Sequence, residues 1–305
     1  MSAHGRAPSG LQRVVKALLL AATTLASAGS AAAGTPIERG RYLVESILAC
    51  GNCHTPKSPA GEPIMERNMA GGLMITAPPF AGTASNITPD RETGIGAWSD
   101  AEIRRAIVEG VRPGHGRLPN TQLAVMPVTL FKALLPRDLD AVVAYLRSVR
   151  PVRSEAPTPV YRMPVHHDKY PDAEAGFTET MMADPLRRGA YLVTIGHCME
   201  CHTPREKGIS DYGKRLGAGG RVFDSQLVQG LPKDWPGARA ANITSHPSSG
   251  LGRWSDAEIK RAITQGISRD GRRLQPPMAF GWYARMTDAD LDAIVAYLRT
   301  VPPIE

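Results

Sequence analysis

The stretch Cys50-Gly51-Asn52-Cys53-His54 places two thiols three positions apart and a histidine directly after the second, and Cys198-Met199-Glu200-Cys201-His202 repeats this pattern. Two thiols at this spacing can form thioethers to the two vinyl groups of one porphyrin, and the adjacent imidazole then lies beneath the iron. The sequence therefore predicts two covalently bound haem c groups. The attachment residues are Cys50, Cys53, Cys198 and Cys201, and the proximal iron ligands are His54 and His202.

Other uses of four cysteines fit less well. Two disulfides are the first expectation for four cysteines in an exported protein, but the spacing and the adjoining histidines argue against them. A thioredoxin-like redox pair needs a strand–helix setting and no histidine. A zinc site needs both pairs close together in space, whereas 144 residues separate Cys53 from Cys198.

The chain aligns with itself, which indicates a duplicated module. The matching segments lie before and after the cysteine motifs: Arg39-Gly40-Arg41-Tyr42 with Arg188-Gly189-Ala190-Tyr191, Asn86-Ile87-Thr88 with Asn242-Ile243-Thr244, and Asp138-Leu139-Asp140 with Asp290-Leu291-Asp292. We divide the chain into a leader (1–33), a first module (34–149), a Pro-rich linker (150–184) and a second module (185–305).

Each module is predicted to be all-α. Ser99 with Glu102, and Ser255 with Glu258, form the capping-box pattern that begins a helix. Each serine follows a tryptophan at the position of a hydrophobic staple, so we assign Trp98 and its counterpart to packing rather than to electron relay. The last helix of each module is amphipathic, with apolar residues at helical spacing.

Gly40 and Gly189 interrupt segments that otherwise read as helical, where glycine is less favourable than alanine by about 1 kcal/mol. A close crossing between the first and last helices of each module accounts for this choice, and we expect Tyr145 and Tyr297 to pack at the contact.

The N-terminus has the pattern of a secretory signal peptide. Arg6, Arg13 and Lys16 precede a short apolar stretch, and Ala31-Ala32-Ala33 offers a small-residue cleavage site. An uncleaved anchor is the alternative. Removal of residues 1–33 would lower the net charge from +7 to near +4, and four haem propionates would nearly neutralise it. We therefore expect no nucleic-acid binding, and we expect the protein in the periplasm, at most peripheral to the inner membrane.

The sixth iron ligand is expected to be methionine. Met126 and Met278 occupy equivalent positions, each twelve residues before the Asp-Leu-Asp of the last helix. Both lie on proline-containing loops, where a thioether can reach the haem face opposite the histidine. The alternative is that they fill the core. The rivals without a counterpart in the other module are His115, His246, Met65, Met69 and Met74.

The polar residues of the Asn-Ile-Thr segments have two possible roles. Asn86, Thr88, Asn242 and Thr244 are equally consistent with hydrogen bonds to haem propionates and with turn formation. The acceptor for the second ring nitrogen of each histidine is not identified by the sequence.

The repeated Cys-His-Thr-Pro, the Asn-Ile-Thr, the Gly-x-Gly-x-Trp-Ser-Asp and the methionine loop resemble those of the cytochrome c subunits of bacterial periplasmic alcohol, aldehyde and gluconate dehydrogenase complexes. The resemblance implies two tandem class I cytochrome c domains with His/Met ligation. The chain departs from the pattern of many members in two respects. Many members carry three haem modules, whereas this sequence has two haem motifs, and many are attached to the membrane near the C-terminus, where this sequence offers no such segment.

The resemblance implies an electron-transfer protein rather than an enzyme. The donor would be a periplasmic dehydrogenase with a quinone, flavin or molybdenum cofactor, and the acceptor another cytochrome, an oxidase or a quinone site. Association with the membrane would occur only through these partners. The alternative is a dihaem enzyme of the peroxidase or thiosulfate dehydrogenase type, which needs a labile or unusual iron ligand. The four attached cysteines and the paired methionines favour the carrier.

Overall fold

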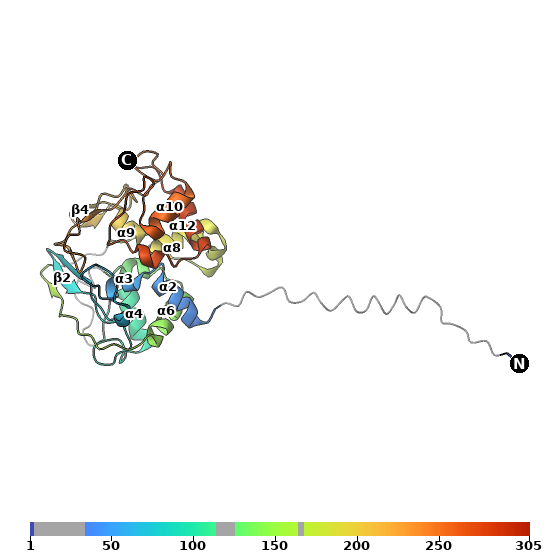
Figure 1. Cartoon of the computed structure of the whole chain (residues 1–305), viewed down its shortest axis with the longest axis horizontal. Helices are drawn as coiled ribbons and strands as arrows, with labels where there is room; N and C mark the ends of the chain where they lie inside the picture. The colour runs from blue at the N-terminus through green and yellow to red at the C-terminus, as the bar shows by residue number, and fades with distance from the viewer. Residues whose placement is uncertain (3–33, 114–125, 164–167) are drawn as a thin grey trace. The chain divides into compact units, whose positions relative to one another are not determined.

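The structure is a computed structural model that describes residues 1–2, 34–113, 126–163 and 168–305. Its contacts divide the chain into two units, Met1–Thr35 and Pro36–Glu305. Every helix and strand described here belongs to the second unit (Figure 1). Apart from its first two residues, the predicted leader lies outside the described residues.

Five helices recur in the same order in the two modules, as the internal repeat predicts. The first module contains α2 (Pro36–Glu45), α3 (Cys50–His54), α4 (Asp100–Glu109), α5 (Val128–Phe131) and α6 (Pro136–Ser148). The second contains α8 (Pro185–Ile195), α9 (Cys198–His202), α10 (Asp256–Gln265), α11 (Phe280–Tyr283) and α12 (Asp288–Thr300). Three further turns of helix are η1 (Met65–Arg67), α7 (Pro171–Ala175) and η2 (Glu179–Ala183).

The prediction of an all-α fold is wrong, because short antiparallel sheets accompany the helices. A four-stranded sheet has the order β3-β2-β1-β7, and two-stranded sheets pair β4 with β5 and β6 with β8. The strands are β1 (Met74–Ala77), β2 (Phe80–Thr83), β3 (Val160–Tyr161), β4 (Arg205–Glu206), β5 (Ile209–Ser210), β6 (Val222–Phe223), β7 (Val228–Gln229) and β8 (Ala238–Arg239). Strands of two to four residues are too short to give an alternating pattern in the sequence.

The four-stranded sheet joins the two modules. Met74 and Ile75 of β1 pair with Gln229 and Val228 of β7, while β2 pairs with β3 of the linker. The insertion that lengthens the second module before Asn242 therefore has a structural role, because it supplies the strand that extends the sheet of the first module.

The predicted helix starts are confirmed. Ser99 accepts a hydrogen bond from the backbone N–H of Glu102, whose carboxylate accepts one from the backbone N–H of Ser99. The same reciprocal pair joins Ser255 and Glu258 at the start of α10. Two of the orphan donors at each helix N-terminus are satisfied in this way.

The predicted close helix crossings are also confirmed. A Cβ atom at Gly40 would lie 1.9 Å from the carbonyl oxygen of Ala141 and 2.7 Å from Cβ of Tyr145. At Gly189 the corresponding distance to the carbonyl oxygen of Ala293 is 2.0 Å. These distances are far inside van der Waals contact, so only glycine allows α2 to meet α6, and α8 to meet α12, at this separation.

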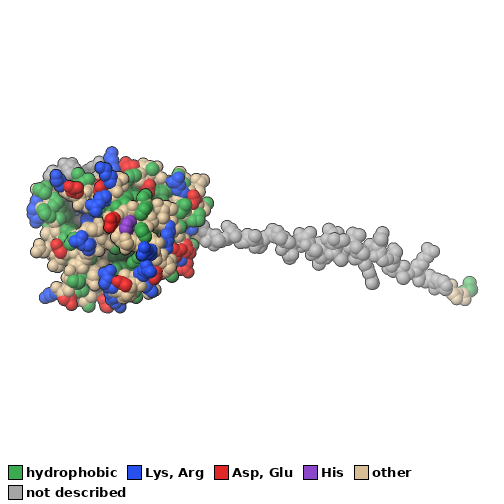
Figure 2. Space-filling model, turned by 90° about the horizontal axis from the view of Figure 1, so that it is seen from above, with side chains coloured by type: hydrophobic (Ala, Val, Ile, Leu, Met, Phe, Trp, Pro, Cys, Tyr) green, Lys and Arg blue, Asp and Glu red, His purple; other side chains and the backbone are tan. Residues whose placement is uncertain are grey.

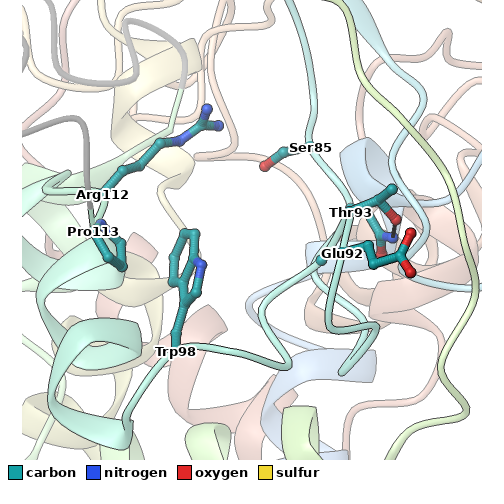
Figure 3. A pocket seen from close by; sticks show the side chains of 8 residues that line it. Ser85, Glu92, Thr93, Trp98, Arg112 and Pro113 are labelled. Atoms are coloured by element: carbon teal, nitrogen blue, oxygen red, sulfur yellow. Dashed lines mark hydrogen bonds between the residues drawn. The ribbon is translucent and has the colours of Figure 1, made fainter.

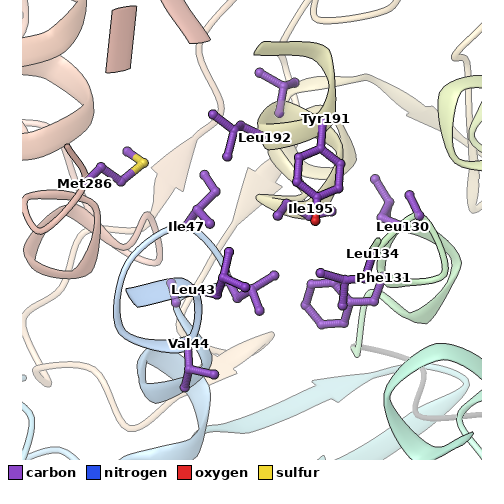
Figure 4. Close-up of a cluster of buried hydrophobic side chains, with 14 of the residues drawn as sticks. Leu43, Val44, Ile47, Leu130, Phe131, Leu134, Tyr191, Leu192, Ile195 and Met286 are labelled. Atoms are coloured by element: carbon purple, nitrogen blue, oxygen red, sulfur yellow. The ribbon is translucent and has the colours of Figure 1, made fainter. Parts of the chain in front are cut away.

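One hydrophobic core runs through both modules. Figure 4 shows side chains of the first module, among them Leu43 and Ile47, in the same cluster as Leu192 and Ile195 of α8. All four are at most 2% exposed. The modules are therefore packed on each other through buried apolar side chains, which fixes their relative position more firmly than a linker alone can do.

The linker region lies against the first module, and the Asn-Ile-Thr segments contribute to this. Asn86 Nδ2 donates to the carbonyl oxygen of Val152 at 2.7 Å. In the second module, Asn242 Nδ2 donates to the carbonyl oxygen of Ile304 at 2.6 Å. Each asparagine thus holds the chain where it leaves the last helix, which supports the structural interpretation of these residues. The assignment of 150–184 as a separate linker remains a prediction.

Candidate haem sites

The two cysteine motifs form matching short helices, α3 and α9. Each is preceded by a residue in the left-handed conformation, Ala49 with φ 46° and His197 with φ 46°. This bend turns the chain sharply from the preceding helix into the motif. The four thiols are not joined in disulfides, so each motif presents two free thiols and one imidazole from a single turn of helix.

The acceptors that the sequence did not identify are backbone carbonyl groups. His54 Nδ1 lies 2.6 Å from the carbonyl oxygen of Ser85, and His202 Nδ1 lies 2.7 Å from that of Ala241. Ser85 and Ala241 are equivalent, since each directly precedes an Asn-Ile-Thr segment. A carbonyl accepts only, so Nδ1 carries the proton and Nε2 is the nitrogen left to bind a metal.

The electrostatics of the motifs suit this role. Desolvation by burial lowers the pKa of both His54 and His202, while the hydrogen bonds to the carbonyl groups oppose that shift. A lowered pKa keeps the imidazole neutral near pH 7, the form in which it binds a metal. Burial also raises the pKa of the Cys50 and Cys198 thiols to about 12. A thioredoxin-like nucleophile needs the opposite shift.

Both candidate methionines are half-buried and lie two residues before the first residue of a short helix. Met126 precedes α5 and Met278 precedes α11, and both pack against the hydrophobic core. The structure therefore keeps them equivalent in space as well as in sequence. Their assignment as distal ligands remains a prediction.

The other candidates for the sixth iron ligand lie in surroundings that differ from those of Met126 and Met278. His246 Nδ1 accepts a hydrogen bond from the backbone N–H of Ser249 at 3.1 Å. Met69 is fully buried, Met74 belongs to β1, and Met65 is 44% exposed. His115 lies outside the described residues.

A cavity of about 210 Å³ lies beside the first histidine site (Figure 3). Ser85, the acceptor for His54, lines it together with Trp98, Arg112 and Thr93. Trp98 and Arg112 project from one side of this cavity in Figure 3. Sequence reasoning missed Arg112, because the second module has Ser268 at the corresponding position and the repeat therefore gave no signal.

A larger cavity of about 540 Å³ lies between the modules. Asn52 and Lys57 line it from the first module, and Met278, Trp282 and Arg285 line it from the second. The first attachment helix and the second methionine loop therefore line the same cavity.

The fold also brings the two cysteine pairs nearer to each other than their sequence separation suggests. Cys53 and Cys201 both pack against one small cluster of Leu73, Phe223, Val228 and Trp235. Even so, no group of three or more His, Cys, Asp and Glu side chains among the described residues could hold a metal ion. The zinc interpretation therefore gains nothing from this proximity.

Residues 186–302 match the family model described as cytochrome c. This match covers most of the second module. The first module lies outside it, and its likeness to the second module rests on the shared helices, the shared cysteine motif and the equivalent histidine contacts.

Curated relatives cover both modules. The alcohol dehydrogenase (quinone) cytochrome c subunit of Gluconacetobacter polyoxogenes is 32% identical over 91% of this chain and 59% of its own length. The gluconate 2-dehydrogenase cytochrome c subunit of Pantoea cypripedii is 30% identical over 95% of the chain and 65% of its own length. A dihaem cytochrome c of Cereibacter sphaeroides is 27% identical over 84% of the chain and 83% of its own length.

The predicted resemblance to the cytochrome c subunits of dehydrogenase complexes is confirmed by these relatives. Each is the cytochrome c subunit of its dehydrogenase. The chain spans about 59% of the length of the alcohol dehydrogenase subunit. Within the described residues, none of the helices combines the length and the apolar character that crossing a membrane requires.

Proposed function

We propose that this chain is a periplasmic electron-transfer protein that binds two haem c groups and passes electrons from a dehydrogenase to a respiratory acceptor. The observation that carries the proposal is the repeated site: a Cys-x-x-Cys-His helix whose histidine donates from Nδ1 to a backbone carbonyl group, present once in each module. Two of the comparisons concern dehydrogenase cytochrome subunits, which supports a dehydrogenase as the donor.

The residues present fit a covalently bound haem. Cys50 and Cys53 would hold the first haem and Cys198 and Cys201 the second. His54 and Met126 would supply the iron ligands of the first haem, and His202 and Met278 those of the second. When bound, the haem supplies reversible one-electron chemistry. The protein's own contribution is to fix each imidazole, to exclude water with its apolar core and to hold the methionine loops.

The acceptor is proposed to be another cytochrome, an oxidase or a quinone site, and export is proposed to depend on residues 1–33. The face of the molecule in Figure 2 mixes basic and acidic side chains, which gives no support to a nucleic-acid partner.

The first test is the haem content of the purified protein. We expect two covalent haems per chain by alkaline pyridine spectroscopy, and one in a Cys50→Ser/Cys53→Ser variant or a Cys198→Ser/Cys201→Ser variant. Near-infrared magnetic circular dichroism of the oxidised protein should give two His/Met signals. A high-spin or a His/His haem would contradict the carrier and favour the dihaem enzyme.

A further inference from the structure

Asn52 lies inside the first cysteine motif, between Gly51 and Cys53, but its side chain reaches the second module. Its Nδ2 donates to the carbonyl oxygen of Pro277 at 2.8 Å. Pro277 directly precedes Met278, so the hydrogen bond fixes the peptide group that leads into the expected distal ligand of the second haem. A half-buried hydrogen bond of this length constrains the backbone of a loop that otherwise has little regular structure.

The other end of the same loop is held by the first module as well, through α3 and the last residue of α2. The ring of Trp282 packs so closely on Gly51 that a Cβ atom there would lie 2.1 Å from the ring. The guanidinium of Arg285 lies 4.6 Å from the centre of that ring, and it also pairs with Glu45 at 3.4 Å. Contacts from Glu45 and Gly51 thus hold the segment after Met278, while Asn52 holds the segment before it.

The contact is not repeated in the same form at the other motif. The residue of the second motif that corresponds to Asn52 is Glu200. A carboxylate accepts hydrogen bonds and, when ionised, donates none. Asn52 of the first motif can therefore donate to the methionine loop of the second module. Glu200 of the second motif, when ionised, cannot donate in the same way to the methionine loop of the first module.

We propose that Asn52 is a positioning residue for Met278, so that the attachment helix of the first haem sets how firmly the second iron holds its thioether ligand. This rests on the proposed function, in which Met278 is that ligand. Loss of the amide donor frees the peptide before Met278 and shifts the balance between the bound and the released thioether. The effect falls on the second haem, although the substitution lies in the motif of the first.

Imidazole is the probe, because it competes with a methionine ligand for oxidised iron. We compare wild type with Asn52→Ala and with Asn52→Asp, which keeps the size of the side chain and removes the donor. Met278→Ala, which has no thioether to displace, identifies the second haem in the titration. The control is Gln229→Ala, which removes a different inter-module hydrogen bond, the 3.4 Å contact with Thr76.

We expect both Asn52 variants to bind imidazole at the second haem roughly five- to tenfold more tightly, since one hydrogen bond contributes about 1 kcal/mol, and to show a lower reduction potential there. The first haem and Gln229→Ala should match wild type. If Asn52→Ala fails to acquire haem, Asn52→Asp gives the same comparison. If wild type shows His/Met ligation and the Asn52 variants have the same imidazole affinity and the same reduction potential at the second haem, the role of Asn52 is overturned and the proposed ligation stands. A wild-type second haem without a methionine signal would instead overturn the proposed ligation.

Discussion

The phenol of Tyr191 donates a hydrogen bond to Asp138 Oδ2 at 2.7 Å, which connects α8 of the second module to α6 of the first. The reverse contact is also present, because the phenol of Tyr42 in α2 donates to Asp290 in α12. Each aspartate also pairs with an arginine of its own module. The repeated Arg-Gly-x-Tyr and Asp-Leu-Asp segments thus serve two purposes, since they join the first and last helices within a module and the two modules to each other.

Asp138→Asn should destabilise the protein strongly. The carboxylate is fully buried and accepts from Arg39 Nε at 2.9 Å and Nη2 at 2.8 Å as well as from Tyr191. The substitution removes the negative charge that compensates the guanidinium of Arg39, and we expect the free energy of unfolding to fall by about 2–4 kcal/mol. Tyr191→Phe removes one hydrogen bond only and should reduce it by about 1 kcal/mol. Urea unfolding followed by circular dichroism measures both, and equal losses would contradict this account.

The same aspartate predicts sensitivity to acid. Burial alone would raise the pKa of Asp138, but the hydrogen bonds and charge of Arg39, with help from Tyr191, lower it overall. A carboxyl whose pKa is lower in the folded than in the unfolded state stabilises the protein above its unfolded pKa of about 3.9. That stabilisation is lost as the pH falls through the folded pKa. The difference in stability between wild type and Asp138→Asn should therefore be full at pH 7 and shrink below about pH 4. A difference that does not depend on pH would rule out the ionic contribution.

Gly40→Ala tests the close helix crossing. In an exposed helix this substitution is favourable by about 1 kcal/mol, but here the new methyl group would overlap the carbonyl oxygen of Ala141. We expect a net loss of about 2–3 kcal/mol, as for other overpacked contacts. Gly213→Ala is the matched control, because nothing lies within 4 Å of a Cβ atom there, and it should change stability by less than about 0.5 kcal/mol. Similar melting curves for the two variants would disprove the steric argument.

The features that the sequence predicted are those with a local cause. The capping boxes at Ser99 and Ser255 depend on residues three positions apart, and the crossing glycines, Gly40 and Gly189, stand out because they interrupt otherwise helical segments. The recurrence of the helices in the second module followed from a repeat whose segments match along most of the chain, although the number of helices did not.

The features that it did not predict depend on residues distant in the chain. The sheet pairs Met74 with Gln229, and Asn52 donates to Pro277, 225 positions away. The backbone carbonyl groups of Ser85 and Ala241 accept from the histidines, and a carbonyl leaves no trace in residue type. The phenols of Tyr42 and Tyr191 were part of a recognised repeat, but nothing in that repeat indicated that each would contact the other module.

Met126→Ala and Met278→Ala should each change one haem only. A thioether opposite histidine raises the reduction potential of a haem, so we expect the potential of the affected haem to fall by about 0.1–0.3 V, within the roughly 0.8 V that axial ligands span. Spectroelectrochemistry of each variant resolves the two potentials, and near-infrared magnetic circular dichroism identifies which methionine signal is lost.

Met69→Leu is the control for both substitutions. Its side chain is fully buried in the core, so replacement by another apolar residue of similar size should leave both potentials and both methionine signals in place. If Met278→Ala retained two His/Met signals, Met278 would be a core residue, and the hydrogen bond from Asn52 to Pro277 would then position only the loop. If each alanine variant lost one signal, the pairing of histidine with methionine would remain to be assigned. Variants that lack one haem assign it, because the signal that remains in them belongs to the other haem, and we expect it to pair His54 with Met126 and His202 with Met278.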